Sequence, residues 1–268
     1  NVFTVPTIVK VLVEHPAVDQ YDHSSLKFMI YAGAPMYRAD QKLALQKLGP
    51  VLVQYFGLGE VTGCITVLPP HMHSADDDDP NANIGSCGRP RTGMEVAILD
   101  KDLKRLPTGE VGEICVRGPA VLFGYHNNRE ATEKALKGGW FHTGDLGRVD
   151  DRGLLYITGR ESDMYISGGS NVYPREVEEI LLTHPGVLEV AVLGVPDPKW
   201  GEVGVAVVVR RPESEQVTPE QLFAHLDGRC AKYRWPREFF FWESLPKSGY
   251  GKITKKDVRA MLIERGDI

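Results

Sequence analysis

The stretch KFMIYAGAPMYRADQKLALQKLGPVLVQYFGLGE, from Lys27 to Glu60, decides the fold class. It holds two short apolar runs, 27–32 and 51–56, that have the character of β-strands. Between them, residues 38–48 follow helical periodicity, and Gly49 is a typical residue to end a helix. Strand, helix and strand with short connections form a βαβ unit, whose strands run parallel. We therefore predict an α/β fold built on a parallel sheet.

Each predicted strand is followed by a glycine-containing loop. The first loop is GAP, residues Gly33, Ala34 and Pro35, and the second is GLGE, residues 57–60. Ligands of parallel α/β sheets bind beyond the carboxyl ends of the strands. We expect both loops to face one crevice.

The character of the sequence changes twice after this unit. Between about 88 and 160, short apolar runs are punctuated by Gly and Pro, which predicts a small twisted sheet or barrel. From about 161 the pattern is that of a compact α+β domain, with helix starts at Pro174 and Thr218 and an acidic capping box at Thr254. We predict domains at 1–160, with subdomains of about 1–87 and 88–160, and at 161–268. The opening residues read as helical, and we expect the chain to be the later part of a longer protein.

Composition narrows the classes of protein. The chain has 268 residues, 42% of them hydrophobic, and a net charge of −5, so a basic face for nucleic acid is not expected. No apolar run approaches the ~20 residues of a transmembrane helix, and the first residues lack the pattern of a signal peptide. The acidic run 76–79 is typical of a solvated surface. The four cysteines lack C-x-x-C spacing, so neither a metal site nor disulfides are predicted from them, and a reducing cytoplasm is the expected compartment.

Six blocks occur in a fixed order along nearly the whole chain. They are YAGAP, FGLGE, GEVGEICVRG, FHTGDLG, ITGRESDMYISGGSN and LPKSGYGKI. In this order they resemble the acyl-CoA synthetase superfamily of AMP-forming, adenylate-forming enzymes, and in particular bacterial fatty-acid and aryl-acid CoA ligases. The resemblance implies a large domain and a small mobile C-terminal lid domain, with ATP bound between them. It also implies two half-reactions, in which a carboxylate attacks the α-phosphate of ATP and the thiol of coenzyme A then displaces AMP.

The resemblance assigns two charged residues to catalysis. Bringing a carboxylate onto a phosphate joins two anions, so positive charge is needed where negative charge develops. Lys252, on the loop of the last block, is similar to the lysine of the family that contacts the reacting groups. Glu60 is similar to the acid that holds the Mg²⁺ of the nucleotide, since a hard cation takes oxygen ligands. The alternatives are a solvated turn for Lys252 and a helix N-terminal acid for Glu60.

Other matched positions are implied to hold the nucleotide. Gly33, Ala34 and Pro35 would lie against one face of the adenine and Phe56, followed by Gly57, against the other. Asp145 resembles the acid that accepts both ribose hydroxyls, and Arg160 would help to hold the ribose or phosphate. A turn aspartate and a surface ion pair are the respective alternatives for these two charged residues.

The second half-reaction is assigned to a glycine-rich turn. Ser167, Gly168 and Gly169 would leave room for the narrow pantetheine arm of coenzyme A. Trp200 resembles an aromatic residue near the nucleotide of coenzyme A. Ser162 occupies the hinge position, where relatives carry Asp or Lys. The alternatives are an ordinary hairpin turn for the glycines and core packing for the tryptophan.

Two departures from the family pattern matter. The phosphate loop rich in Ser, Thr and Gly is absent, so the chain by itself is predicted to be inactive and to need the missing N-terminal half. Gly59 replaces the usual threonine, which removes a hydrogen bond to the α-phosphate and widens the acid pocket. We predict an ATP- and Mg²⁺-dependent acid–CoA ligase, with a medium- or long-chain fatty acid as first choice of substrate and an aryl acid as second. The alternatives are an adenylation domain that loads a carrier protein and a truncated, non-catalytic binding module.

Overall fold

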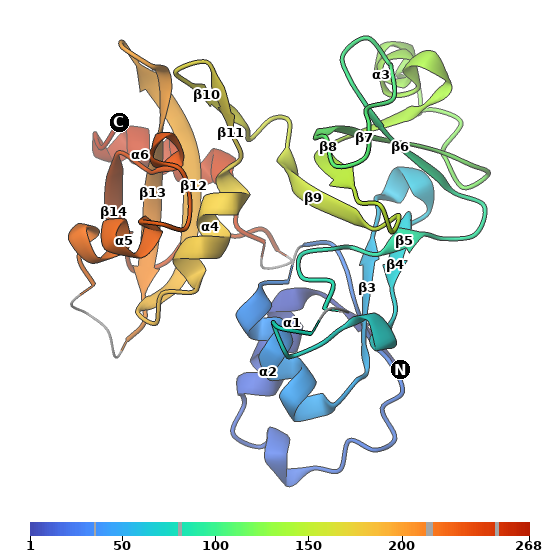
Figure 1. Cartoon of the computed structure of the whole chain (residues 1–268), viewed down its shortest axis with the longest axis horizontal. Helices are drawn as coiled ribbons and strands as arrows, with labels where there is room; N and C mark the ends of the chain where they lie inside the picture. Colours follow the sequence, from blue (N-terminus) through green and yellow to red (C-terminus); the bar gives the residue numbers. More distant parts are fainter. Residues whose placement is uncertain (35, 80–81, 213–216, 250–251) are drawn as a thin grey trace. The chain divides into compact units, whose positions relative to one another are not determined.

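The structure is a computed structural model that describes residues 1–34, 36–79, 82–212, 217–249 and 252–268 (Figure 1). The chain divides into two compact units, Asn1–Thr158 and Gly159–Ile268. Each unit is described by itself. Within the described residues, no helix has both the length and the apolar character needed to cross a bilayer.

The predicted strand–helix–strand unit is present in the first unit. It consists of β2 (Met29–Tyr31), α2 (Arg38–Leu48) and β3 (Leu52–Phe56). The two strands pair in parallel, with Met29 beside Leu52, which confirms the predicted direction. The helix ends at Gly49, whose φ of 78° few other residues adopt and whose N–H donates to the Leu45 carbonyl.

The beginning of the chain differs from the prediction. Residues Val2–Thr4 form strand β1, and the helix α1 (Pro6–Glu14) begins only after it. Branched and aromatic side chains favour strands, and β1 pairs in parallel with β2, while Pro6 suits the first turn of the helix. The five-stranded sheet has the order β1-β2-β3-β4-β5. Its last strands are β4 (Thr66–Leu68), antiparallel to β3, and β5 (Arg89–Pro90).

A second sheet forms the β-rich part of the first unit, and its last strand, β9, continues two residues into the second unit. Its order is β6-β7-β8-β9, and the pairs β6–β7 and β7–β8 are antiparallel. Alternate residues of β7 face two hydrophobic clusters. Ile114 and Val116 pack in one cluster, and Cys115 packs with Trp140 in the other. The elements are β6 (Glu95–Leu99), β7 (Gly112–Arg117), α3 (Arg129–Ala135), β8 (Phe141–Val149) and β9 (Leu155–Arg160).

The second unit is the predicted α+β arrangement around a sheet that is buried on both faces. The long strands β12 and β13 are almost continuously apolar, and their alternate residues face two separate cores. Helices α4 and α5 cover one face and α6 covers the other (Figure 1). The sheet order is β11-β10-β13-β12, and β14 pairs in parallel with β13. The elements are β10 (Tyr165–Ser167), β11 (Ser170–Val172), α4 (Pro174–Leu182), β12 (Val187–Asp197), β13 (Gly201–Arg210), α5 (Pro219–Leu226), β14 (Glu238–Trp242) and α6 (Lys255–Arg265).

The starts of helices α5 and α6 differ in their caps. Thr218 forms a capping box with Gln221 at the start of α5. Thr254 is the N-cap of α6, but its side chain makes no capping hydrogen bond, so the acidic capping box predicted there is wrong. The Thr254 N–H donates instead to the Pro246 carbonyl at 3.0 Å, and Asp257 is one methylene shorter than the glutamate of a capping box.

Candidate functional site

The two predicted loops of the first sheet follow adjacent parallel strands. Gly33 lies just after β2 in an exposed position, with a φ of 82°, and Ala34 beside it is half-buried. Phe56 ends β3 and packs against the core of the β-rich sheet. Because β2 and β3 are parallel, their carboxyl ends share one edge of the sheet. Pro35 lies outside the described residues.

Gly57 is required by the path of the backbone. A Cβ at this position would lie 2.6 Å from the Gly63 carbonyl oxygen and 2.8 Å from the Cys64 Cα. Gly59 is different, since a Cβ there would meet nothing within 4 Å. The first glycine therefore lets two backbone segments approach each other, and the second leaves open space.

Glu60 stands in a short 3₁₀ turn, Gly59–Val61, rather than at the start of a longer helix. Its Oε1 accepts a hydrogen bond from the Tyr125 hydroxyl at 3.1 Å, and its carbonyl accepts one from the Leu122 N–H at 2.7 Å. Burial, followed by the Glu60 carboxylate, raises the pKa of Tyr125. Tyr125 was not predicted as a site residue, because no short-range pattern joins positions 65 residues apart.

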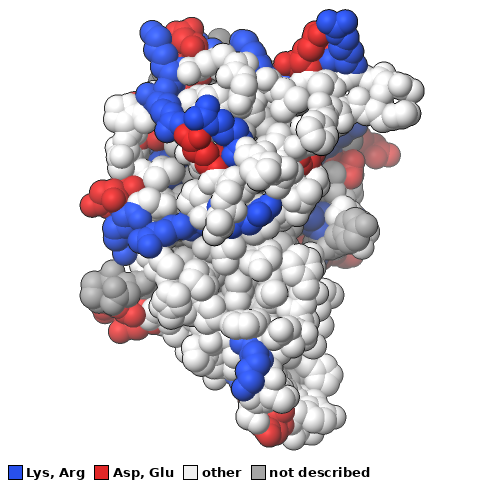
Figure 2. Space-filling model, turned by 90° about the vertical axis from the view of Figure 1, so that its right-hand side faces the viewer, with Lys and Arg blue, Asp and Glu red and all other residues white. Residues whose placement is uncertain are grey.

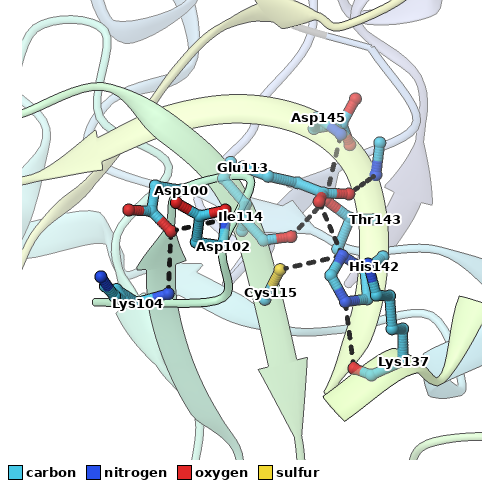
Figure 3. Close-up of polar contacts among 11 residues, drawn as sticks. Asp100, Asp102, Lys104, Glu113, Ile114, Cys115, Lys137, His142, Thr143 and Asp145 are labelled. Carbon is cyan, nitrogen blue, oxygen red and sulfur yellow. Dashed lines mark hydrogen bonds and ion pairs between the residues drawn. The ribbon is translucent and has the colours of Figure 1, made fainter. Parts of the chain in front are cut away.

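Asp145 lies inside strand β8 and not in a turn, so the turn alternative is wrong for it. The residue is 6% exposed. Its N–H donates to Thr143 Oγ1 at 3.1 Å, and this hydroxyl donates to the Ile114 carbonyl at 2.7 Å (Figure 3). Strand β8 is thereby tied to its neighbour β7 next to the aspartate.

A second set of contacts holds the same strand. Glu113 Oε1 accepts from the Gly144 N–H at 3.2 Å, and Glu113 Oε2 lies 2.6 Å from His142 Nδ1 (Figure 3). Cys115 Sγ is 3.5 Å from the same nitrogen. Burial, and then Glu113, raise the pKa of the Cys115 thiol. The sequence analysis did not identify Glu113, Cys115 or His142 as site residues, although they lie in its ordered blocks. Glu113 and Cys115 are two positions apart on a strand and therefore share a face, which is the signal that could have indicated them.

Arg160 and Ser162 lie where the chain passes from β9 to β10. Arg160 is the exposed last residue of β9, and its carbonyl accepts hydrogen bonds from the N–H groups of Asp163 and Met164, each at 3.1 Å. Ser162 stands in the turn that follows, and its hydroxyl donates to Asp163 Oδ1 at 3.3 Å. The predicted hinge residue is therefore part of an exposed turn.

The glycine-rich turn is a two-residue hairpin. Ser167, which ends β10, pairs with Ser170 of β11, and the φ angles of Gly168 and Gly169 are 56° and 83°. A Cβ on Gly168 would lie 2.8 Å from Trp200 Cε3, whereas a Cβ on Gly169 would meet nothing within 4 Å. The hairpin alternative is thus correct as a description of the backbone.

Trp200 is brought against this hairpin from the connection between β12 and β13. The ring is 49% exposed, so it is not core, and the Trp200 carbonyl accepts from the Gly168 N–H at 2.9 Å. The N–H groups of Trp200 and Lys199 both donate to Asp197 Oδ1 at 2.8 Å. The Trp200 N–H, with smaller effects of the Lys199 N–H and Arg237, lowers the pKa of Asp197.

Lys252 is exposed and lies two residues before the N-cap of α6. Its carbonyl accepts from the Ser248 N–H at 2.8 Å, and its N–H donates to Ser248 Oγ at 3.3 Å. Lys247 and Ile253 form an isolated antiparallel bridge on either side. The ends of the lysine loop are therefore held together by backbone hydrogen bonds.

Comparison with known proteins finds two family matches and many similar chains. A medium/long-chain-fatty-acid–CoA ligase of Mycobacterium tuberculosis is 40% identical over 97% of this chain and 46% of its own length. A feruloyl-CoA synthase of Amycolatopsis sp. is 41% identical over 96% of this chain and 51% of its own length. The solved structure of an amide bond synthetase from Marinactinospora thermotolerans is 37% identical, with a TM-score of 0.89, over 97% of this chain and 52% of that one.

This chain spans about half the length of these curated relatives. Residues 2–126 match the family of AMP-binding enzymes, and residues 176–252 match the C-terminal domain of the same enzymes. Lys252 is the last residue of the second match, whereas Asp145, Arg160 and the glycine hairpin lie between the two matches. The chain belongs to the family of adenylate-forming, AMP-binding enzymes.

Proposed function

We propose that this chain is the rear part of an ATP- and Mg²⁺-dependent acid–CoA ligase that forms an acyl-adenylate and then a thioester. The observation that carries the proposal is that one chain matches both the AMP-binding domain and, up to Lys252, the C-terminal domain of these enzymes. In this proposal residues 1–160 belong to the large AMP-binding domain and 161–268 form the mobile lid, with Ser162 at the hinge. The protein acts in the cytoplasm, and its cysteines are free thiols.

The nucleotide is assigned to the first unit. Phe56 and the Gly33 loop would hold the adenine, since they follow adjacent parallel strands. Asp145 would accept hydrogen bonds from the ribose hydroxyls, because a carboxylate has two acceptor oxygens and this one belongs to a strand fixed by Thr143. Arg160 would add a permanent positive charge near the ribose or phosphate.

Glu60 fits the role of a magnesium ligand. Its Oε1 accepts a hydrogen bond from the Tyr125 hydroxyl, and its Oε2 has no partner among the described residues. Mg²⁺ keeps several waters and is usually bound by one or two carboxylates together with substrate phosphates, so a single glutamate suffices on the protein side. When bound, the ion would partly neutralise the phosphates of ATP. The chain's own contribution to the anionic reaction centre is the ammonium group of Lys252.

Coenzyme A is assigned to the hairpin of the second unit. The exposed ring of Trp200 lies against Gly168, while the space beside Gly169 is open. A flat aromatic surface beside a turn without side chains would suit a narrow pantetheine chain and the ring of a nucleotide. Ser167 supplies a hydroxyl at the end of β10.

The proposed acid is a medium- or long-chain fatty acid, followed by an aryl acid. The name of the mycobacterial relative supports the first choice and that of the feruloyl-CoA synthase supports the second. A Cβ at Gly59 would meet nothing within 4 Å, and this open space supports a roomy acid pocket. Gly59→Thr is then expected to lower turnover of the longest acids more than that of short ones.

An apolar surface near the start of the chain supports a missing preceding half. Strand β1 pairs with β2 on one side, and among the described residues its other edge has no strand partner. Ile8, Val11 and Leu12 of α1 are 46%, 57% and 44% exposed. Figure 2 shows that the lower part of this view, where Figure 1 has the N-terminal residues, carries few charged side chains. Such an edge and face suit a further part of the same sheet and core.

The proposal is tested on the full-length protein that contains this chain. Pyrophosphate release from ATP is measured with octanoate, palmitate and ferulate, with and without coenzyme A, and the thioester is quantified. We expect acid-dependent release, thioester formation with coenzyme A, and the highest kcat/KM for a fatty acid. An Asp145→Asn variant serves as the matched control for nucleotide binding, and should raise the KM for ATP.

The outcomes separate the alternatives. Release with ferulate only would make the aryl acid the substrate. Release without thioester would favour transfer to a carrier protein or to an amine, the latter in keeping with the amide bond synthetase relative. No acid-dependent release by the full-length protein would contradict the ligase and favour a binding module.

A further inference from the structure

Three side chains of different chemistry converge on one point of the β-rich sheet. Glu113 and Cys115 share a face of β7, and Cys115 is paired across the ladder with His142 of β8. One ligand atom of each lies within 4.8 Å of those of the other two. Figure 3 shows the carboxylate, the thiol and the imidazole pointing toward one another. Cys115 is buried, and the other two are half-buried.

The imidazole of His142 faces acceptors on both sides. Its Nε2 is 3.1 Å from the Lys137 carbonyl, which can only accept a hydrogen bond, so this nitrogen carries a proton. Its Nδ1 faces the Glu113 carboxylate at 2.6 Å and the Cys115 sulfur at 3.5 Å. The short Nδ1–Oε2 contact needs either a shared proton or a metal ion between the two atoms.

We propose that Glu113, Cys115 and His142 form a binding site for a thiophilic divalent cation, with Zn²⁺ as the best match. Zinc binds sulfur, imidazole nitrogen and carboxylate oxygen, and sites with three protein ligands keep a fourth position for water. Mg²⁺ and Ca²⁺ do not fit a thiolate. Histidine ligands of zinc usually donate their other ring N–H to a carbonyl or carboxylate, as Nε2 does here to Lys137.

The distances require a small rearrangement. Metal–ligand bonds of about 2.0–2.3 Å at tetrahedral angles place ligand atoms roughly 3.3–3.6 Å apart. Nδ1 and Sγ already have this separation, at 3.5 Å. Nδ1 and Oε2, at 2.6 Å, would move apart by under about 1 Å, which is within the reach of the half-buried Glu113 side chain. The cation displaces the thiol proton and the proton shared between Nδ1 and Oε2, and both go to solvent.

This site is separate from the proposed magnesium ligand, Glu60, and does not depend on the proposed ligase function. It is connected to the candidate nucleotide site through one contact, because Glu113 Oε1 holds the Gly144 N–H next to Asp145. A cation on Oε2 leaves that contact in place. The binding can therefore be measured without any assay of activity.

The test uses the full-length protein that contains this chain, without a histidine tag and stripped with a chelator. Zn²⁺ is titrated in competition with a chromogenic indicator, and Co²⁺ is added to a second sample for its absorption spectrum. We expect one Zn²⁺ per chain and, with Co²⁺, the charge-transfer band of a thiolate ligand. Cys115→Ala and His142→Gln should each weaken Zn²⁺ binding by roughly 100-fold or more. Cys64→Ala and His126→Gln, which alter the same residue types outside the cluster, should leave it unchanged.

The Co²⁺ spectrum keeps the proposal testable should a buried variant fail to fold. A Co²⁺ complex without a thiolate band overturns the site, as does Zn²⁺ affinity that survives Cys115→Ala or that falls with Cys64→Ala. Absence of Zn²⁺ binding to the folded chain also overturns it and leaves a direct hydrogen bond between His142 and Glu113.

Discussion

Asp145 and Lys252, two candidate site residues of opposite charge, are held in different ways. Asp145 is 6% exposed on a strand that Thr143 and Glu113 tie to its surroundings. Lys252 is exposed, and its backbone is held by hydrogen bonds with Ser248. A buried strand holds an acceptor in place with little loss of entropy on binding, whereas ordering an exposed lysine side chain on binding costs more rotamer entropy. Under the proposed function, the acceptor would hold the nucleotide throughout, and the cation would serve one step.

The largest effect on activity is expected from substitution of Lys252. In the full-length protein, Lys252→Ala should lower the rate of acyl-adenylate formation about 10²–10³-fold, because positive charge is lost where negative charge develops. Thioester formation from supplied acyl-adenylate should change little, and the free energy of unfolding should change by no more than about 0.5 kcal/mol. The half-reactions are measured separately, with Lys256→Ala on α6 as the control. An equal loss in both half-reactions would contradict the assigned role.

The next effect concerns the pH dependence of the free energy of unfolding, through a buried histidine of the first unit. Burial lowers the pKa of His73 to about 4, and its ring contacts the Pro69 carbonyl at 3.0 Å and the Tyr31 hydroxyl at 3.2 Å. Between about pH 6.5 and pH 4 the unfolded chain binds a proton that the folded ring excludes, so stability falls as the pH falls. The loss should reach about 3 kcal/mol across this range, measured by urea unfolding.

His73→Gln is the control for this pH dependence. Burial also lowers the pKa values of His184 and His225 in the second unit, and their contribution should remain in the variant. If wild type and His73→Gln lose the same stability between pH 7 and pH 5, His73 is not the group responsible.

A smaller effect is expected from substitution of Glu113, which accepts a hydrogen bond from the Gly144 N–H next to Asp145. Glu113→Gln should weaken ATP binding to the full-length protein by about tenfold, because a hydrogen bond to a charged group is worth about 1.5–3 kcal/mol. A glutamine side chain has one acceptor oxygen and one donor NH₂ group, so its two terminal atoms cannot act as acceptors toward Gly144 and His142 at the same time. The Kd is measured by calorimetry with a chelator of zinc present. The exposed Glu110→Gln is the matched control, and an equal change in both variants would rule out positioning by Glu113.

The smallest effect concerns the hairpin of the second unit. Gly168→Ala and Gly169→Ala both place a side chain at positive φ, which costs about 1–2 kcal/mol. Only the first also meets the ring of Trp200, at 2.8 Å from Cε3. Gly168→Ala should therefore be less stable than Gly169→Ala by about 1 kcal/mol in urea unfolding. Equal stabilities would mean that the ring moves aside freely.

Sequence reasoning was most successful where a local pattern decides the structure. The βαβ unit, the helix stop at Gly49 and the helix start at Pro174 depend on residues within a few positions of one another. It failed at β1, where pairing with β2 outweighs a helix-like start, and at Thr254, where a contact with Pro246 replaces the cap. In both cases a partner outside the local window decides the outcome.

The sequence by itself determined most of the elements, the ordered blocks of the family and the candidate residues on them. The tertiary structure decided which of these residues meet. Glu60 and Tyr125 are 65 positions apart and Cys115 and His142 are 27 apart, and each pair touches only because strands and turns pack in one register. The physical reason is that periodicity reports which face of an element is apolar, whereas contacts between faces depend on how whole elements pack against each other.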